Sequence, residues 1–122
     1  MNKILRRAAL GASLLLAALT SAAAQEWPSR NVTVVVPIPA GVTSDIVARV
    51  VFEQVGNQLG QTFVIENRPG AGGTIGGNMV AKATPDGYTI LVWGSIAAAN
   101  ALYTKLPYDT LNDFTQIGRA HV

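Results

Sequence analysis

Apolar and polar positions follow two different periods along the chain. Val32–Val36 is a short run of β-branched residues that ends at Pro37, which predicts a buried strand. From Thr43 to Leu59 the apolar residues recur at helical spacing, and Gly60 predicts the end of that helix. The positions expected to share its apolar face are Ile46, Val47, Val50, Val51, Val55 and Leu59.

The same two patterns recur further along the chain. We predict strands at Thr62–Glu66 and Tyr88–Trp93 and helices at Thr74–Ala83 and Ile96–Tyr103. Strands that alternate with helices over short connections indicate an α/β fold, in which a parallel sheet is flanked by helices. Thr43 or Ser44 is expected to cap the first helix, and Thr74 the second.

The first 24 residues have a different character. Lys3, Arg6 and Arg7 precede the almost purely apolar run Ala8–Ala18, and small residues follow up to Ala24. This pattern is typical of a secretory signal peptide that is cleaved after Ala24. The apolar run is shorter than the roughly 20 residues that a membrane-spanning helix needs. We therefore expect a protein that is exported from a bacterial cytoplasm.

Charge and composition exclude several kinds of site. Removing the leader takes three of the nine basic residues and none of the seven acidic ones, so the formal net charge changes from +2 to −1. No basic cluster is left to bind nucleic acid. The chain has no cysteine and a single histidine, His121, which we expect to be exposed and without function. No catalytic residue, metal site or cofactor is predicted.

Ligands of open parallel sheets bind in the loops at the carboxyl ends of the strands. In the first such loop, Gly41 gives conformational freedom, and the amides of Val42–Asp45 at a helix start can face an anion. Thr43 and Ser44 add hydroxyl groups, although an ordinary helix start would look the same. In the third loop, Gly94 and Ser95 could contribute an amide and a hydroxyl, while Trp93 lines a pocket or belongs to the core.

The second loop, Gly70–Gly77, suggests an alternative function as a nucleotide-dependent enzyme. It follows a predicted strand and opens a predicted helix, but Ile75 stands where the dinucleotide fingerprint needs glycine. No Gly-Lys-Ser/Thr sequence follows, so it is not a P-loop either. Tight helix packing explains these glycines more simply.

The remaining charged residues are expected to have ordinary roles. Arg49 is predicted to be a solvated helix residue, and Arg68 either binds an anion or pairs with Glu66. Asp109 and Asp113 are four residues apart in a polar loop and are not expected to form an acid–base pair.

Taken together, these segments resemble the Bug family, the periplasmic substrate-binding proteins of tripartite tricarboxylate transporters. The Glu66–Gly76 block is the most specific part of the resemblance, which spans nearly all of Trp27–Gly118. The matching blocks are Trp27–Arg30, Pro37–Gly41, Ser44–Arg49, Glu66–Gly76, Pro85–Leu91, Leu106–Asp109 and Asp113–Phe114.

The resemblance implies a periplasmic binding protein fold (type II), in which two α/β lobes close on a small carboxylic acid. It implies capture of a dicarboxylate, tricarboxylate or related organic acid for membrane permease subunits, by a protein that is monomeric when full length. The first loop would donate hydrogen bonds to the ligand carboxylate, and the third loop would line the same cleft. The residues expected at the ligand are Ala40, Gly41, Val42, Thr43, Ser44, Asp45, Gly94 and Ser95.

Two positions depart from the family pattern. Val42 stands where the family usually has a second glycine, and a Cβ atom there would restrict positive φ. Ile38 stands between two prolines, where an aromatic residue is common. Both changes leave the identity of the acid open.

The resemblance also implies that the chain is truncated. Residues 25–122 would form an incomplete N-terminal lobe, and the second lobe would be missing. Ile117–Val122 resembles the translation of a sequencing adapter, so Arg119–Val122 is expected to be non-native. We expect residues 25–122 alone to bind no carboxylate with useful affinity, because half of the cleft is absent. A third interpretation is that the protein is an interaction module on the cell surface that binds no ligand.

Overall fold

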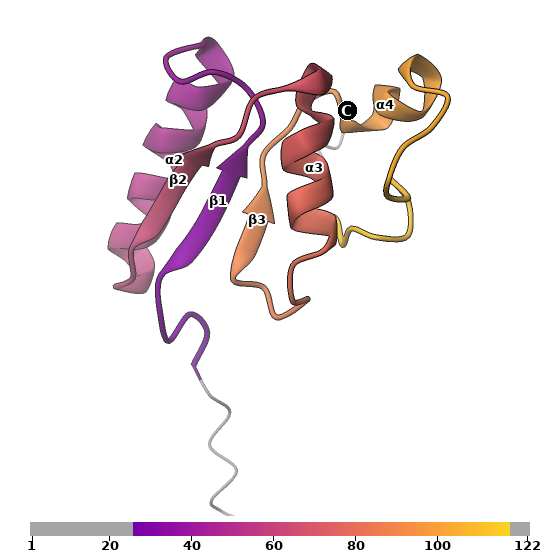
Figure 1. The fold of residues 1–122 in the computed structure, drawn as a ribbon. Coiled ribbons are helices and arrows are strands. Elements are labelled where there is room, and N and C mark those ends of the chain that lie inside the picture. The colour runs from indigo at the N-terminus through magenta and orange to yellow at the C-terminus, as the bar shows by residue number, and fades with distance from the viewer. Residues whose placement is uncertain (1–25, 118–122) are drawn as a thin grey trace, which may run out of the picture.

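The computed structural model describes residues 26–117 and confirms the predicted order of strands and helices (Figure 1). The predicted signal peptide, His121 and Arg119–Val122 lie outside the described range. The elements are β1 (Val32–Val36), α2 (Thr43–Leu59), β2 (Phe63–Asn67), the 3₁₀ turn η2 (Ala71–Gly73), α3 (Thr74–Ala81), β3 (Thr89–Leu91) and α4 (Ile96–Leu102).

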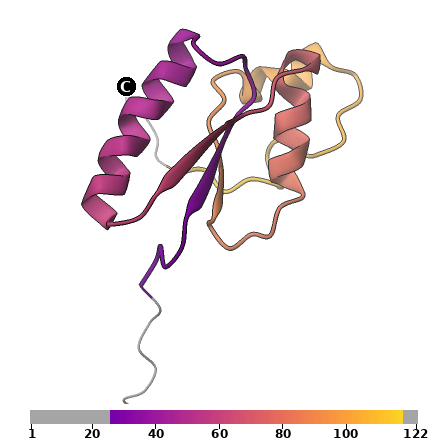
Figure 2. The same cartoon turned by 60° about the vertical axis from the view of Figure 1, so that its left-hand side comes forward.

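The three strands form a parallel sheet in the order β2-β1-β3. Val36, the last residue of β1, lies opposite Asn67, the last residue of β2, and Val35 lies opposite Leu91 of β3. The chain moves outward from β1 to β2 and then back across β1 to β3. Crossover connections between parallel strands are right-handed. Because these two crossovers run in opposite directions along the sheet, their helices α2 and α3 cover opposite faces (Figure 2).

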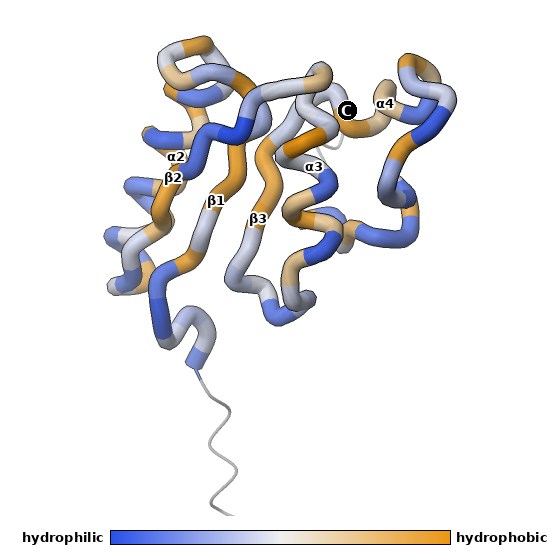
Figure 3. Tube along the Cα trace, in the orientation of Figure 1, coloured by the Kyte–Doolittle hydropathy of each residue, from blue (hydrophilic) through white to orange (hydrophobic). Residues whose placement is uncertain are grey.

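The centre of the core is β1, where Val32, Val34, Val35 and Val36 are completely buried. A central strand covered on both faces is apolar along its whole length, as the sequence pattern predicted. Figure 3 shows apolar residues along β1 and β3 and a polar carboxyl end of β2.

Helix α2 turns a different face to the sheet from the one that its apolar spacing predicts. Asp45 and Ala48 are buried, and Phe52 stacks on Phe63 of β2 with 5.4 Å between ring centroids. The small Ala48 side chain allows the helix to pack closely against β1. The predicted face was wrong for five of its six members, because Ile46, Val47, Val50, Val51 and Leu59 are 44–57% exposed, while Val55 is partly buried.

Both capping predictions were also wrong. Val42 caps α2 in an extended conformation, and Thr43 is already helical. Gly73 precedes α3, and the hydroxyl of Thr74 donates to the Ala71 carbonyl oxygen at 2.9 Å. A residue that has entered the helix cannot reach forward to the free amides of the first turn, so neither threonine acts as a cap.

At the amino end of the strands, the lead-in segment is fastened to the turn before β3. The Ser29 amide donates to the Tyr88 hydroxyl oxygen at 2.9 Å, and the Arg30 guanidinium lies 3.9 Å from the centre of the Tyr88 ring. Arg30 also pairs with Asp86 at 2.9 Å. None of the helices within residues 26–117 is long and apolar enough to span a lipid bilayer.

Candidate functional site

The three strand–helix loops lie together at the carboxyl edge of the sheet, at the top of Figure 1. The chain leaves β1 towards one side and β3 towards the other, so the boundary between these strands is the topological switch point. Ligands of open α/β sheets bind in the crevice outside such a point. The predicted residues Ala40–Asp45 and Gly94–Ser95 follow the two strands that flank it.

The β1–α2 loop presents backbone amides at the start of α2. Gly41 has φ of +88°, a conformation that side-chain-bearing residues rarely adopt. Val42 has φ of −78°, so the loop does not require glycine there, and its Cβ atom causes no backbone strain. The amides of Val42, Thr43 and Ser44 donate to no acceptor within residues 26–117, and all three residues are exposed.

Asp45 is buried beneath this loop with 1% of its surface exposed. Its Oδ2 atom accepts hydrogen bonds from the Gly41 amide at 2.8 Å and from Arg49 Nε at 3.0 Å. Its Oδ1 atom accepts one from Asn67 Nδ2 at 2.8 Å. The hydrogen bond from Arg49, followed by those from Gly41 and Asn67, lowers the pKa of Asp45 to about 2. The carboxylate is therefore ionised at neutral pH and faces the interior of the loop.

Arg49 and Asn67 complete this network, and sequence reasoning missed both. Arg49 is half exposed, as expected of a solvated helix residue, but its Nη2 atom also donates to Asn67 Oδ1 at 2.8 Å, which the sequence did not predict. The spacing of Asp45 and Arg49, four residues apart on a helix, was a signal that could have revealed the pair. Asn67 carried no comparable signal, because its neighbours come from distant parts of the chain.

On the other side of the switch point, Trp93 packs under the glycine-rich loop. A Cβ atom on Gly73 would lie 2.7 Å from the Trp93 ring, so glycine is required for this contact. Gly94 and Ser95 are exposed, and no atom of residues 26–117 lies within 4 Å of the position that a Gly94 Cβ would take. Trp93 therefore supports the core, while Gly94 and Ser95 remain accessible at the edge.

Gly73, Gly76 and Gly77 of the second loop are buried under side chains of the same chain, while Gly70 and Gly72 are exposed. Tyr103 packs against Gly72, Pro37 against Gly76 and Tyr108 against Gly77. A phosphate-binding loop needs open backbone amides at these positions. The contacts thus favour the packing role over nucleotide binding.

The other charged residues are engaged locally. Arg68 pairs with Glu66 at 2.9 Å in an exposed ion pair, which is one of its two predicted roles. Asp109 accepts hydrogen bonds from the amides of Leu111 and Asn112, which lower its pKa, and its own amide donates to Asp113. These two carboxylates shape a turn. In the described part of the chain, no group of acidic or histidine side chains is arranged to hold a metal ion.

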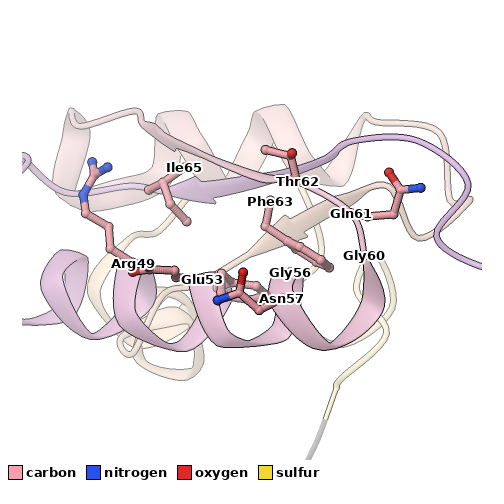
Figure 4. Close-up of a pocket in the computed structure, with 10 residues that line it drawn as sticks. Arg49, Glu53, Gly56, Asn57, Gly60, Gln61, Thr62, Phe63 and Ile65 are labelled. Atoms are coloured by element: carbon pink, nitrogen blue, oxygen red, sulfur yellow. The ribbon is translucent and has the colours of Figure 1, made fainter.

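A groove with a volume of about 590 Å³ lies elsewhere, between α2 and the outer edge of β2 (Figure 4). A second hollow, of about 430 Å³, lies beside α4. Neither contains a predicted ligand residue. The groove is lined by Arg49, Phe52, Glu53, Gly56, Asn57, Gly60, Gln61, Thr62, Phe63 and Ile65.

Comparison with known proteins identifies one family from both sequence and structure. A family profile described as the tripartite tricarboxylate transporter family receptor matches residues 47–121. A UPF0065 protein of Bordetella bronchiseptica is 46% identical over 116 residues, which cover 93% of this chain and 35% of the relative. This chain thus spans about a third of the length of that relative.

Solved structures of periplasmic binding proteins have the same fold over their matched parts. BugD is 45% identical with a TM-score of 0.68, and the match covers 72% of this chain and 30% of BugD. MatC from Rhodopseudomonas palustris with bound malate is 47% identical with a TM-score of 0.69, covering 73% and 31%. A second R. palustris protein, solved with adipate, is 42% identical with a TM-score of 0.67, covering 70% and 29%.

Proposed function

Because this chain belongs to the family of tripartite tricarboxylate transporter receptors, we propose that it forms part of an exported receptor that captures a small carboxylate. The observation that carries the proposal is the start of α2, where the consecutive amides of Val42, Thr43 and Ser44 are exposed and have no acceptor within residues 26–117. Malate in one structural neighbour and adipate in another support a carboxylate as the ligand class.

A helix start attracts an anion without a basic side chain. The unpaired amides of the first turn and the aligned peptide dipoles give this end of α2 a partial positive charge. The hydroxyl groups of Thr43 and Ser44 would add donors to one carboxylate, and Gly94 and Ser95 would line the opposite side. Ala40 would contact the ligand through its backbone.

Gly41 and Asp45 have indirect roles in this proposal. The Gly41 amide already donates to Asp45, and both oxygens of the Asp45 carboxylate are engaged. The negative charge of Asp45 is offset by Arg49, which limits its repulsion of an anionic ligand. These two residues would therefore shape the loop, while Val42–Ser44 would contact the acid.

The mechanism that we propose is closure of two lobes around the ligand. Binding would shift a population of open and closed receptors towards the closed form, which permease subunits in the membrane would recognise. The leader predicted at residues 1–24 would direct the receptor to the periplasm. Neither step needs a catalytic residue, and the family and its structural neighbours are binding proteins.

A hybrid receptor tests the proposal directly. The segment of MatC that matches this chain would be replaced by the corresponding part of residues 26–117, and malate, adipate and the uncharged 1,6-hexanediol would be titrated by calorimetry. We expect at least one acid to bind with micromolar affinity and the diol not to bind. Residues 25–122 alone should bind neither acid, because one side of the ligand would remain in water. A folded hybrid without affinity for either acid would contradict the proposal.

A further inference from the structure

The partners of Asp45 come from three different segments, and all of them are donors. Gly41 belongs to the loop, Arg49 to the second turn of α2, and Asn67 to the end of β2. A carboxylate accepts hydrogen bonds on both oxygens, so it satisfies all three partners at once. An amide at the same position would place its NH₂ group against another donor.

Asn67 connects the network to the beginning of the loop. Its Nδ2 atom also donates to the carbonyl oxygen of Ile38 at 3.1 Å, while its Oδ1 atom accepts from Arg49. Asn67 lies beside Val36, the last residue of β1, because the two strands are in register there. The network therefore holds the loop at Ile38 and again at Gly41, immediately before the exposed amides of Val42–Ser44.

Few other contacts could define the shape of this loop. Residues Pro39–Ser44 are exposed, and in the described part of the chain no atom lies within 4 Å of the position that a Gly41 Cβ would take. A loop that is ordered only when the ligand arrives loses conformational entropy on binding, which weakens affinity.

We propose that Asp45, Arg49 and Asn67 are positioning residues that fix the β1–α2 loop in advance, so that the amides of Val42–Ser44 are already aimed at the ligand. The role in ligand binding rests on the proposed function. The role in loop geometry does not, so the two can be tested separately.

Two isosteric variants remove the network without changing side-chain size. Asp45→Asn introduces a donor where the partners are donors, and Asn67→Asp introduces a second carboxylate facing Asp45 and the Ile38 carbonyl. Asp86→Asn is the matched control, because it removes a carboxylate from an exposed ion pair at the opposite edge of the sheet. A third variant, Arg49→Lys, keeps the positive charge. Its ammonium group cannot reproduce the geometry in which Arg49 Nε donates to Asp45 and Nη2 donates to Asn67.

The first measurement is amide hydrogen exchange by NMR on the full chain. The Gly41 amide should exchange about tenfold or more slowly than an unprotected amide, and should lose this protection in Asp45→Asn and Asn67→Asp. The Thr33 amide, which donates to the Tyr88 carbonyl oxygen in the sheet, should stay protected and so report an intact fold. Unchanged Gly41 protection in a folded variant would overturn the positioning role. If both isosteric variants unfold, the positioning role is tested in Arg49→Lys by the same comparison of Gly41 and Thr33 amide protection.

The second measurement is malate and adipate affinity in the MatC hybrid. Asp45→Asn and Asn67→Asp should weaken binding about tenfold, while Asp86→Asn should not change it. Lost Gly41 protection with unchanged affinity would overturn the link to the ligand. A folded hybrid that binds neither acid would defeat the proposed function, and the Gly41 exchange result would still decide whether the network positions the loop.

Discussion

Asn67 Nδ2 donates a hydrogen bond to Asp45 Oδ1 at 2.8 Å, which joins the end of β2 to the first turn of α2. The two residues are 22 positions apart in sequence. They meet because β2 returns parallel to β1 and ends in register with it, next to the loop that leads into α2. The pairing of two strands thus sets the geometry of the loop that follows one of them.

Asp45 should make the stability of the fold depend on pH. Its pKa is lowered from 3.8 to about 2 in the folded protein, so folding favours the ionised form. The resulting stabilisation is complete well above pH 3.8 and is lost progressively as the pH falls through 3.8 towards about 2. Asp45→Asn cannot show this change, because it has no proton to bind.

Urea unfolding of both proteins between pH 2 and pH 6 would measure this effect. We expect the difference in free energy of unfolding between the original protein and Asp45→Asn to be constant above about pH 4.5 and to shrink below it. Asp109 also has a lowered pKa, but it is present in both proteins and cancels in the difference. A difference that stays constant down to pH 2 would contradict the prediction.

Gly73 should be much less tolerant of alanine than Gly94. Gly73 has φ of +98°, and an added Cβ atom would lie 2.7 Å from the Trp93 ring. We expect Gly73→Ala to destabilise the fold by about 2 kcal/mol or more, because backbone strain and overpacking add. The Cβ atom added in Gly94→Ala meets no atom of the described residues, so this variant should change stability by less than about 0.5 kcal/mol. Equal thermal unfolding temperatures for the two variants would refute the packing role of Gly73.

Most of the fold could be predicted because its signals are local. The buried β-branched run of β1, the helix that ends at Gly60 and the alternation of strands and helices all follow from short stretches of sequence. The parallel sheet and the resemblance to the Bug family are confirmed by the structure and by the relatives. Capping was not predictable in this way, because whether Thr43 lies just before or just inside the helix depends on one pair of backbone angles.

The site was only partly predictable, for a related reason. The position of the β1–α2 loop at the carboxyl edge follows from the order of the elements alone. The burial of Asp45 does not, because it depends on donors that Asn67 and Gly41 bring together only in the folded chain. The exposed apolar positions of α2, such as Val47, were misassigned because periodicity gives the spacing of a face but not its direction.

The hydroxyl groups at the start of α2 should contribute directly to carboxylate affinity. In the MatC hybrid, Ser44→Ala and Thr43→Val each remove one exposed donor and leave the backbone amides in place. If one hydroxyl bonds to the ligand carboxylate, its loss should weaken binding about tenfold, the range for a hydrogen bond to a charged group. Thr84→Val, in the exposed turn before β3, is the control for removing a threonine hydroxyl. Unchanged affinity in both variants would leave the backbone amides as the sole donors of this loop.

Tyr88 should hold the lead-in segment against the turn before β3. Its hydroxyl lies 2.9 Å from the Ser29 amide and 3.0 Å from the Ser29 hydroxyl, and these hydrogen bonds lower the pKa of Tyr88. Tyr88→Phe keeps the ring beneath the Arg30 guanidinium and removes only these bonds. We expect a loss of at most about 1 kcal/mol in stability, because the contacts are exposed. Cleavage by trypsin after Arg30 should nevertheless become several-fold faster, because local opening of the segment becomes easier while the sheet stays intact. An unchanged cleavage rate would mean that the ring and the Arg30–Asp86 pair hold the segment without the hydroxyl.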